Sequence, residues 1–537
     1  MADQGPKRIL VLGGGFAGVY AAIELERLLQ GRDDYQITLI NRENYFVYQP
    51  MLPEIISGSI GLFDTVSPLR RLLPKTNVQV RDVESVDLEQ KVVVTSPGFK
   101  PVAHRIRYDH LILALGTVTD FRGMTGLTQH ALPFKNLGDA LFLRNHVIHA
   151  LEEASIEGDS ELRQALLTFV IAGGGFSGVE VAAELNDFVR GVAKTYRGID
   201  RSEIKVILLH GGARILPELT EKLGLLAQKV LAQRGVDIRF NAYLQAATTD
   251  AAILRDGTHI PTKTLVSTVP SSPNPILDML ALPKERGKIK VSNQLQVEGS
   301  DHLWALGDCA LVPLPDGKSF APPTAQHAIQ EAKVAAHNLV ASLRGGTRKT
   351  FDFGGLGKMG SLGHHSAVAE AFGMQFSGLL AWLMWRTVYL MKLPGWDRRF
   401  RTAVSWGTDL FLPPDIVQLK IAHSAGVTQE HYEPGDDIFR QGDLGDRLYI
   451  IIKGRCDVLR VIDGREQTLA NLGPGEYFGE MALLNQTTRG ATIRCTEGLD
   501  VLSLRKGDFG ALVTHLPALR ESFEKVVDRR NLGPGPD

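Results

Sequence analysis

The sequence predicts an α/β protein with two Rossmann-like units, the second inserted in the first, and a C-terminal β-barrel. An apolar strand, a G-x-G-x-x-G loop and a helix with small residues on its packing face occur twice, at residues 11–22 and 170–185. Near-continuous apolar runs recur to about residue 340, which is typical of parallel strands covered on both faces. Short strands rich in Ile, Val and Leu, separated by glycines, follow after residue 425 and predict the jelly-roll-like barrel.

The glycines of the two loops have separate roles. The first glycine permits a tight turn, the second lets a pyrophosphate approach the backbone, and the third lets the helix pack closely on the strand. The phosphates then lie at a helix N-terminus. Two such loops predict two dinucleotides, with electron transfer between them. In chain order the glycines are Gly13, Gly15 and Gly18, then Gly173, Gly175 and Gly178.

Composition limits the function. The chain has 537 residues, enough for about three domains, and its 59 basic residues balance 60 acidic ones, so we expect no nucleic-acid binding by the molecule as a whole. Cys309, Cys456 and Cys495 form no C-x-x-C pair and no metal-binding spacing, which argues against disulfide exchange and fits a reducing compartment. The N-terminal residues lead into the first strand without an apolar signal segment, so we expect the protein to stay where it is made.

Four apolar segments order the units along the chain. Residues 37–40 and 206–209 are predicted as the second strands of the two units, and residues 109–116 and 303–310 as two further buried strands that each lead into a glycine. The first unit is thus interrupted by the second, at about residues 117–270, and then resumes.

This order resembles the two-dinucleotide-binding-domain flavoproteins, in which FAD lies on the first unit and NAD(P)H on the second. The resemblance implies an FAD-binding domain of residues 7–116 and 271–345 and an NAD(P)H-binding domain of residues 117–270. The segment LILALG, which ends at Gly116, matches the family's strand near the FAD. In LGD, Asp308 would hydrogen-bond the ribityl or pyrophosphate part of FAD.

The ribose positions depart from the simplest pattern, in which an acidic residue follows the glycines by about 20 residues. Asn41 holds that place in the first unit and is followed by Arg42 and Glu43. An amide still donates and accepts hydrogen bonds, so we still expect FAD there. His210 holds the place in the second unit, where the absence of a carboxylate removes its repulsion of a 2′-phosphate. The resemblance favours NADH, with NADPH as the alternative.

The segments around the flavin narrow the class. Disulfide reductases need a redox cysteine pair, and sulfide:quinone reductases also rely on cysteines, whereas this region has only Cys309. The segments NYFVYQPMLPEIISGSI (44–60), VSPLRRLLP (66–74) and APPTAQHAIQEAKVAAHNL (321–339) instead resemble the type II NADH:quinone dehydrogenases. This similarity extends over residues 7–419.

In that family an AQ-x-A-x-Q helix lies beneath the flavin ring and lines the quinone pocket. Here it supplies Gln326 and Gln330, which are four residues apart and therefore share one helical face. Pro322 and Pro323 precede the helix, whose N-terminal amides would face a flavin carbonyl and stabilise the reduced ring. The alternative is that both glutamines are ordinary polar residues on a solvent-facing helix.

Glu180 follows the second glycine loop and matches a family residue placed between nicotinamide, flavin and quinone. The match implies that Glu180 orients the nicotinamide or relays a proton to the reduced quinone. Such an acid needs a raised pKa in a semi-buried site. Glu184, one helical turn on, is the rival candidate. The alternative for either residue is a surface carboxylate near a helix N-terminus.

The resemblance also implies which residues contact each cofactor. The FAD set is Gly13, Gly15, Phe16, Ala17, Gly18, Asn41, Arg42, Gln49, Val83, Gly116, Asp308, Ala325 and Gln326. The NAD(P)H set is Gly173, Gly175, Phe176, Ser177, Gly178, Glu180 and His210.

Residues 346–420 are predicted to form an amphipathic helical segment that associates with a membrane. The run FSGLLAWLMWRTVYLMKL is aromatic and leucine-rich, but a charge interrupts it, so we expect no spanning helix. We expect a helix in the membrane interface instead, on an anionic lipid surface. The alternative is a buried helix that packs on the core or on a second subunit, and a homodimer can coexist with membrane contact. The basic residues of the segment are Arg386, Lys392, Arg398, Arg399 and Arg401.

Residues 425–530 resemble the cyclic-nucleotide-binding domain, most specifically in the phosphate cassette FGEMALL…TTRGAT. Amides at the start of its short helix would face the cyclic phosphate, Arg489 would pair with the phosphate oxygens, and Glu480 would accept from the ribose 2′-hydroxyl. The residue after the arginine is not the threonine of cGMP binders, so cAMP is favoured. The alternative is a domain that keeps the fold without the ligand. The implied ligand residues are Gly479, Glu480, Met481, Ala482, Arg489 and Gly490.

Only one further helix is predicted after the barrel, at residues 511–527, which argues against a DNA-binding helix-turn-helix. Together these features predict a peripheral flavoenzyme that passes a hydride from NAD(P)H to FAD and two electrons to a membrane quinone, without pumping protons. We expect it at the cytoplasmic face of a bacterial inner membrane, with cyclic nucleotide regulating membrane docking or quinone access. Two alternatives stay open: a soluble NAD(P)H-dependent reductase with a protein or oxygen acceptor, and a redox and cyclic-nucleotide sensor module.

Overall fold

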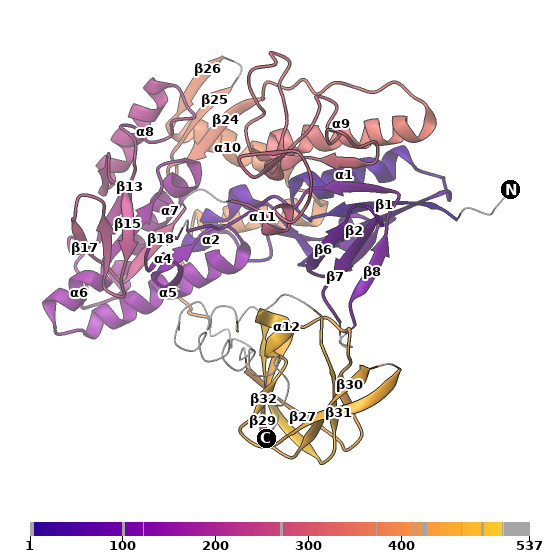
Figure 1. Ribbon diagram of the computed structural model, residues 1–537. Coiled ribbons are helices and arrows are strands. Elements are labelled where there is room, and N and C mark those ends of the chain that lie inside the picture. Colours follow the sequence, from indigo (N-terminus) through magenta and orange to yellow (C-terminus); the bar gives the residue numbers. More distant parts are fainter. Residues whose placement is uncertain are drawn as a thin grey trace. The chain divides into compact units, whose positions relative to one another are not determined.

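Figure 1 shows the computed structural model of the chain. The chain divides into two compact units. Unit 1 comprises Met1–Val80 and Tyr108–Leu419, and unit 2 comprises Arg81–Arg107 and Lys420–Asp537. The structure describes residues 5–98, 102–121, 123–268, 272–371, 373–412, 414–419, 427–462, 464–484, 488–506 and 509.

A five-stranded parallel sheet forms one half of unit 1. Its central strand is buried over its last four residues, as its apolar run predicts, and its final residue Leu12 is paired with Ile40 on one side and Leu113 on the other. Helix α1 (Phe16–Leu28) packs on this sheet, and α9 (Ala325–Arg344) lies beside α1 (Figure 1). In sheet order the strands are β22 (Leu303–Ala305), β9 (His110–Leu113), β1 (Lys7–Leu12), β2 (Tyr35–Asn41) and β5 (Asn77–Val80).

A second five-stranded parallel sheet repeats this design and confirms the predicted α/β fold with two Rossmann-like halves. Its central strand is buried throughout, and Ala172 at its end is paired with Leu209 and Ser267. In sheet order the strands are β11 (Ala131–Pro133), β18 (Thr264–Ser267), β12 (Thr168–Ala172), β13 (Lys205–Leu209) and β14 (Val236–Arg239). The longer helices of this half are α5 (Leu137–Ile156), α6 (Ser160–Leu166), α7 (Phe176–Val192) and α8 (Glu221–Gln233).

Short elements join or flank the two halves of unit 1. Strand β10 pairs antiparallel with β19 where the chain passes from the first sheet to the second and back, and α2 packs on α7. These elements are β3 (Tyr45–Val47), η1 (Gln49–Met51), α2 (Pro53–Ser57), β4 (Val66–Pro68), α3 (Leu69–Leu72), β10 (Thr117–Val118), α4 (Leu127–His130), η2 (Ala193–Thr195), β15 (Leu244–Ala247), β16 (Ala251–Leu254), β17 (His259–Pro261), β19 (Ser272–Pro273), η3 (Pro275–Leu277), β20 (Lys284–Glu285), β21 (Lys288–Lys290), η4 (Gly307–Cys309) and β23 (Ala310–Leu311).

A three-stranded antiparallel sheet and two helices complete unit 1. Helices α10 (Gly378–Lys392) and α11 (Trp396–Asp409) agree with the helical prediction for this segment. The prediction of helix alone misses the strands before them, because runs of Gly and Ala carry little strand signal. Among the described residues, none of the helices has the length and apolar character needed to cross a membrane. The missed strands are β24 (Gly357–Ser361), β25 (Ala367–Ala371) and β26 (Met374–Ser377).

Arg386 corrects the interpretation of the basic cluster. The sequence places it among residues that face lipid, whereas its side chain is buried within unit 1. Its Nη2 lies 3.6 Å from Glu54 Oε1 and 3.5 Å from Asp409 Oδ2, and its guanidinium lies 4.0 Å from the centre of the Trp382 ring. Carboxylates and an aromatic face replace the water that a buried guanidinium loses. Glu54 is far from Arg386 in the sequence, so the local sequence carries no sign of this pairing.

Antiparallel sheets dominate the described part of unit 2 and confirm the predicted all-β C-terminal domain. Two four-stranded sheets share an apolar core that includes Phe439, Tyr449 and Phe478. The predicted helix at residues 511–527 lies outside the described residues. One sheet contains β27 (Val427–Tyr432), β34 (Leu499–Arg505), β29 (Arg447–Lys453) and β32 (Tyr477–Phe478), and the other β28 (Asp437–Phe439), β33 (Thr492–Cys495), β30 (Cys456–Ile462) and β31 (Arg465–Leu472). Unit 2 also contains α12 (Glu480–Leu484) and a sheet of β6 (Val83–Asp87), β7 (Val92–Thr95) and β8 (His104–Arg107).

Close packing of helix on strand makes Gly178, at the start of α7, hard to replace. A Cβ atom there would overlap the carbonyl O of Gly173. We expect Gly178→Ala to lower the free energy of unfolding by about 1–3 kcal/mol, the usual cost of overpacking. Gly407→Ala is the matched control, because no atom lies within 4 Å of its Cβ position in α11. It should raise stability by about 0.5–1 kcal/mol through helix propensity. Denaturant unfolding measures both, and equal effects would contradict the packing argument.

Candidate active site and nucleotide-binding sites

The first glycine loop is closely packed at its two ends and open in its middle. Gly13 has φ +107°, and a Cβ atom there would overlap the carbonyl O of Ala114. A Cβ atom at Gly18 would overlap the carbonyl O of Gly13. At Gly15, by contrast, no atom lies within 4 Å of the Cβ position. The protein's own packing therefore requires the first and third glycines, whereas the middle glycine leaves room for a ligand to reach the backbone.

The second glycine loop has the same design. Gly173 has φ +124°, and the side chain of Thr268 occupies the space that a Cβ atom would need. At Gly178 that space is taken by the carbonyl O of Gly173. A Cβ atom at Gly175 would meet only Glu218 Oε1, at 3.4 Å, which is an ordinary contact. Both loops thus keep their middle glycine accessible.

Asn41 supports the first loop from the end of β2. Its Oδ1 accepts a hydrogen bond from Gly14 N at 2.8 Å, and its Nδ2 donates to the Glu43 carbonyl O at 2.9 Å. The amide predicted to bind ribose is therefore already used to fix the loop. The carboxylate of Glu43 lies 3.5 Å from Asn41 Nδ2, so an acidic group stands beside the predicted ribose position.

His210 has the equivalent place under the second loop, at the end of β13. A Cβ atom at Gly174 would lie 2.6 Å from its ring, and one at Gly212 would lie 2.8 Å from its Nε2. The imidazole therefore lies directly against the glycine loop, as Asn41 does in the first half. In the adjoining first turn of α7, Phe176 is half-buried and Ser177 is exposed.

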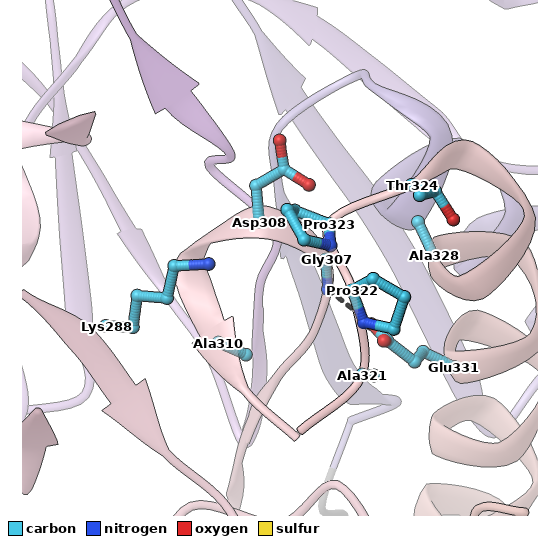
Figure 2. Close-up of a pocket in the computed structure, with 10 residues that line it drawn as sticks. All are labelled: Lys288, Gly307, Asp308, Ala310, Ala321, Pro322, Pro323, Thr324, Ala328 and Glu331. Atoms are coloured by element: carbon cyan, nitrogen blue, oxygen red, sulfur yellow. Dashed lines mark hydrogen bonds between the residues drawn. The ribbon is translucent and has the colours of Figure 1, made fainter. Parts of the chain in front are cut away.

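A small pocket lies between η4 and the start of α9 (Figure 2). Gly307 has φ +73°, and its N donates to Glu331 Oε2 at 2.7 Å. A Cβ atom at Gly307 would lie 2.9 Å from Ala17 Cβ, so the next residue, Asp308, lies close to the first turn of α1. Burial raises the pKa of Glu331 to about 7. The pocket is lined by Lys288, Gly307, Asp308, Ala310, Ala321, Pro322, Pro323, Thr324, Ala328 and Glu331.

Aromatic side chains lead from the first glycine loop towards α10. Phe16 and Ala17 are buried in the first turn of α1. The Phe16 ring packs edge-on against Phe46 and Tyr48, with centroids 5.0 and 5.5 Å away. Tyr48 in turn packs against Tyr389 of α10 at 6.0 Å. A continuous apolar path thus runs from the predicted FAD site to the C-terminal helices of unit 1.

The remaining predicted FAD contacts are less closely grouped. Arg42 and Gln49 are exposed, and Gln49 Nε2 donates to the Lys135 carbonyl O at 3.5 Å. Gly116 has φ +61° just after β9, with open space at its Cβ position. Val83 begins β6 in unit 2, so its role beside the loop of unit 1 stays a prediction.

Gln326 joins the first turn of α9 to the edge of β24. Its Oε1 accepts from Leu356 N at 3.0 Å, and its Nε2 donates to the Gly357 carbonyl O at 3.1 Å. Ala325 begins the helix, and Gln330 is half-buried one turn after Gln326. Gln326 is therefore not an ordinary solvent-facing residue, and sequence spacing gave no sign of these backbone partners.

Glu180 and Glu184 lie on the buried face of α7. Glu180 is 8% exposed, and its Oε1 accepts a hydrogen bond from Ser361 N at 3.0 Å. Burial raises the pKa of Glu180 to about 8. Burial, together with the nearby Glu54 carboxylate, likewise raises the pKa of Glu184 to about 8. The alternative of a surface carboxylate is therefore wrong for both residues, and both have the raised pKa that a general acid needs.

Glu54, on α2, is a further buried acid that sequence reasoning missed. Its side chain is 3% exposed. Trp406 Nε1 donates to Glu54 Oε2 at 2.8 Å, and Arg386 lies on the other side of the carboxylate. Burial raises the pKa of Glu54 to about 7. The only sequence signal is a charged residue inside the apolar run QPMLPEIIS.

In unit 2, Arg489 is buried at the predicted phosphate cassette, with 3% of its surface exposed. Its Nη1 donates to the Gly479 carbonyl O and its Nη2 to the Arg447 carbonyl O, both at 2.8 Å. The guanidinium lies 4.0 Å from the centre of the Phe439 ring. Its Nε is buried and has no hydrogen-bond partner in the described part of the chain.

The other cassette residues surround this guanidinium. Glu480 is buried at the start of α12, and Met481 and Ala482 follow it in the same helix. Gly479 has φ +91°, which favours glycine at this turn. Gly490 is exposed, with open space at its Cβ position. The cassette thus combines the buried side chains of Arg489 and Glu480 with an exposed Gly490 that has open space beside it.

Family models match three parts of the chain. The "Pyridine nucleotide-disulphide oxidoreductase" model matches residues 7–332, the "NDH2 C-terminal domain" model residues 356–412, and the "Cyclic nucleotide-binding domain" model residues 429–515.

Curated relatives and solved structures agree with these matches. The type II NADH:quinone oxidoreductase NdhA of Mycobacterium tuberculosis is 31% identical over 76% of this chain and 87% of its own. The demethylphylloquinone reductase NdbB of Synechocystis is 31% identical over 76% of this chain and 97% of its own. The fold is similar to that of NDH2 from Plasmodium falciparum, solved in complex with NADH, with a TM-score of 0.71 at 20% identity over 76% of this chain and 99% of that one. The chain therefore belongs to the pyridine nucleotide-disulphide oxidoreductases and, within them, to the type II NADH:quinone oxidoreductase family, and it carries a cyclic nucleotide-binding domain at its C-terminal end.

Proposed function

We propose that the protein is a peripheral membrane flavoenzyme that oxidises NADH and reduces a membrane quinone without pumping protons. The observation that carries this proposal is the open space over Gly15 and Gly175, the middle glycines of two loops in a chain of this family. A Cβ atom at either glycine would project into the space that the pyrophosphate of a dinucleotide requires. Two such cradles in one unit favour electron transfer between two dinucleotides.

FAD fits the first loop. The pyrophosphate would lie over Gly15 at the N-terminus of α1, with Asp308 beside it and Glu43 at the ribose. Bound FAD supplies a carrier that takes a hydride from the nicotinamide and passes two electrons on. The protein would supply placement: the buried Phe16 and Ala17 shape the start of α1, and the free amides at the start of α9 would face the ring.

NADH fits the second loop, with its pyrophosphate over Gly175 and its adenosine ribose at His210. Glu180 stands beyond this loop on α7 and is protonated below about pH 8 because burial disfavours its charge. It would orient the nicotinamide or hold a proton for the reduced quinone. Gln326 and Gln330 would line the quinone pocket, with Gln326 held by the backbone of β24.

A lipid surface fits the outer faces of α10 and α11. Apolar side chains there are exposed, including Trp396 at 82%, and Lys392 and Arg401 are exposed among them. The exposed apolar residues are Leu379, Leu380, Leu383, Met391, Trp396, Phe400, Val404, Leu410, Phe411 and Leu412. Of the predicted basic cluster, Arg386 and Arg398 are largely buried, so Lys392 and Arg401 would carry the contact with anionic lipid.

The C-terminal domain would bind a cyclic nucleotide, with cAMP favoured. Arg489 and Glu480 are both buried at the cassette, and Arg489 Nε has no hydrogen-bond partner among the described residues. We propose that the nucleotide regulates the enzyme, since a ligand acts through different affinities for two arrangements of the chain. A titration of NADH:quinone turnover with cAMP tests this regulation, and an unchanged rate at saturating, verified binding would remove it.

Stopped-flow spectroscopy tests the main proposal. NADH should bleach the flavin absorbance of the purified protein, and a soluble quinone should restore it at a rate compatible with turnover. The same experiment with NADPH gives the nicotinamide preference. A colourless protein after reconstitution with FAD, or a flavin that NADH leaves oxidised, would contradict the proposal.

The open space at Gly15 predicts a selective loss of flavin. Gly15→Ala adds a Cβ atom that meets no protein atom but occupies the pyrophosphate position. We expect FAD affinity to fall about tenfold to hundredfold, equivalent to about 1–3 kcal/mol, with unfolding of the flavin-free protein unchanged. Flavin absorbance after purification and thermal unfolding of the apoprotein measure the two effects. Gly158→Ala, an exposed position with open space, is the control. Normal flavin content in Gly15→Ala would contradict the assignment.

The position of His210 predicts the nicotinamide preference. His210→Asp restores a carboxylate that binds ribose hydroxyls and repels a 2′-phosphate. We expect the ratio of kcat/KM for NADH to that for NADPH to rise about tenfold. His210→Asn changes the side chain without adding charge and should leave the ratio nearly unchanged. If both variants shift the ratio equally, charge at this position does not set the preference.

The charge of Arg489 should contribute strongly to the affinity for a cyclic nucleotide. Arg489→Gln removes the charge that would pair with the phosphate, and we expect cAMP affinity to fall about hundredfold. Calorimetric titration measures the affinity, and thermal unfolding checks that the domain is folded. Arg460→Gln, at an exposed position of β30, is the control. Equal cAMP affinity in both variants would place the phosphate elsewhere.

A further inference from the structure

Four carboxyl groups form a cluster around Glu54 in the interior of unit 1, and two of them lie beside the Arg386 guanidinium. Arg386 Nη2 lies 3.6 Å from Glu54 Oε1 and 3.5 Å from Asp409 Oδ2. Glu180 and Glu184 follow on α7, which packs on α2, the helix of Glu54. One buried cation cannot balance four buried anions, because an unpaired charge in a low-dielectric interior is costly. The cluster must therefore hold protons.

The four carboxylates form a series that leads from solvent to the interior. His364, whose side chain is 37% exposed, has its Nδ1 3.9 Å from Asp409 Oδ2. The Asp409 side chain is 12% exposed and that of Glu54 is 4% exposed. Exposure thus falls in steps from a group at the surface to an acid in the core.

The inner half of the series lies along one face of α7. The Ser57 side chain, on the same helix as Glu54, hydrogen-bonds the Glu184 carboxyl and lowers its pKa, while the Glu54 carboxylate raises it. Glu180 is one helical turn before Glu184 and therefore on the same face. Glu180 is the last acid of the series and lies beside β24, where Ser361 N donates a hydrogen bond to its Oε1.

The pairing at Arg386 is loose. Distances of 3.5 and 3.6 Å exceed the roughly 2.7–2.9 Å of a strong charge-assisted hydrogen bond. Arg386 is instead held by the Trp382 and Trp406 rings, whose centres lie 4.0 and 4.8 Å from the guanidinium. A cation fixed in this way stabilises negative charge on the carboxylates beside it, because it does not have to move to pair with either one.

The chemistry of the proposed function requires such a path. Reduction of a quinone to a quinol consumes two electrons and two protons. NADH supplies both electrons and one proton as hydride, so each turnover takes one further proton from solvent. If Glu180 donates that proton, it becomes a buried anion and must be reprotonated before the next turnover.

We propose that Glu54 and Glu184 relay this solvent proton from the His364–Asp409 side to Glu180, with Arg386 balancing the charge of the relay. The proposal rests on the proposed function. Glu54 and Glu184 act through Glu180 and touch neither substrate nor cofactor in this scheme. Each proton that leaves Glu180 is replaced from Glu184, then from Glu54, and finally from solvent, so atoms and charges balance over one turnover.

Other groups that face the relay come from every element packed around it. Their charges and hydrogen bonds set the pH range over which it works, and they must be kept unchanged in the tests. They are Tyr48, Asp187, Ser361, His365, Trp385, Arg386, Tyr389 and Trp406.

Glu54→Gln tests the relay, because the amide keeps the shape of the side chain but cannot exchange a proton. We expect flavin reduction by NADH to be unchanged and flavin reoxidation by quinone to slow about tenfold or more, as for loss of a proton-transfer group. In the wild type the reoxidation rate should fall as the pH rises through about 7–8, the range in which the carboxyls lose their protons. Glu221→Gln, at an exposed position of α8, is the control and should match the wild type.

A second readout does not depend on turnover. Infrared spectra of the protein should contain bands of protonated carboxyl groups at about pH 6 that disappear by about pH 9, and Glu54→Gln and Glu184→Gln should each lack one of them. The folded-state pKa of each acid lies above its unfolded value of 4.5, so each stabilises the fold at low pH, and this stabilisation is lost as the pH rises from about 4.5 to about 7–8. Glu54→Gln should therefore lose less thermal stability than the wild type over this range.

The outcomes are separable. If NADH does not reduce the flavin of the wild type, the proposed function fails. If reduction and reoxidation proceed in the wild type and Glu54→Gln reoxidises at the wild-type rate at every pH, the relay fails. Absence of the carboxyl bands also overturns the relay. If Glu54→Gln does not fold, Glu184→Gln is subject to the same criteria.

Discussion

Both nucleotide loops depend on one steric constraint, the close approach of a helix to the strand before it. No side chain fits between the first and third glycines of either loop, since the carbonyl O of Gly13 or Gly173 already fills that space. The helix must therefore begin immediately after the turn, with its first amides beside the middle glycine. In the second half this helix is α7, which also carries Glu180. A single packing contact thus sets both the nucleotide cradle and the position of the buried acid relative to it.

Burial of acids on α7 has a cost that the surrounding elements offset. Glu180 and Glu184 face the interior, where water cannot solvate their charge, and their raised pKa keeps both neutral near pH 7. A neutral carboxyl needs only hydrogen bonds, which Ser361 N provides for Glu180. The cost of burying these acids therefore makes the stability of the fold depend on pH. The proton that neutralises each buried carboxyl group is also a proton that quinone reduction could consume.

Sequence reasoning succeeded where the signal is local. The glycine loops and their strands are set by residues a few positions apart, so the two parallel sheets and the β-rich C-terminal domain were predictable. It failed where partners are distant in the chain. Arg386 was assigned to a lipid-facing cluster with later basic residues, whereas it is buried between two tryptophan rings and beside Glu54, which is distant in the sequence.

The same limit applies to the details of the sites. Asn41 is predicted to contact the ribose, and the sequence gives no sign that its Oδ1 accepts a hydrogen bond from Gly14 N or that its Nδ2 faces the Glu43 carboxylate. The amide bonds of Gln326 depend on a strand that the sequence did not predict, because Gly-rich segments lack strand signal. Local pattern therefore identified which helix and loop form the site, and tertiary packing decided which atoms are available.

Helix α10 lies between the two reactants that the proposed reaction takes from its surroundings, the quinone and the proton. One face buries Trp382, Trp385 and Arg386 against the carboxylate series, and the opposite face exposes Leu380 and Leu383. A quinone dissolved in lipid would arrive at the exposed face, whereas the proton would arrive through the buried one. Of the two charged residues of the helix, Arg386 faces inward and Lys392, at its C-terminal end, is exposed. The inward position of Arg386 lets the exposed face before Lys392 be mainly apolar while the arginine lies beside the acids behind it.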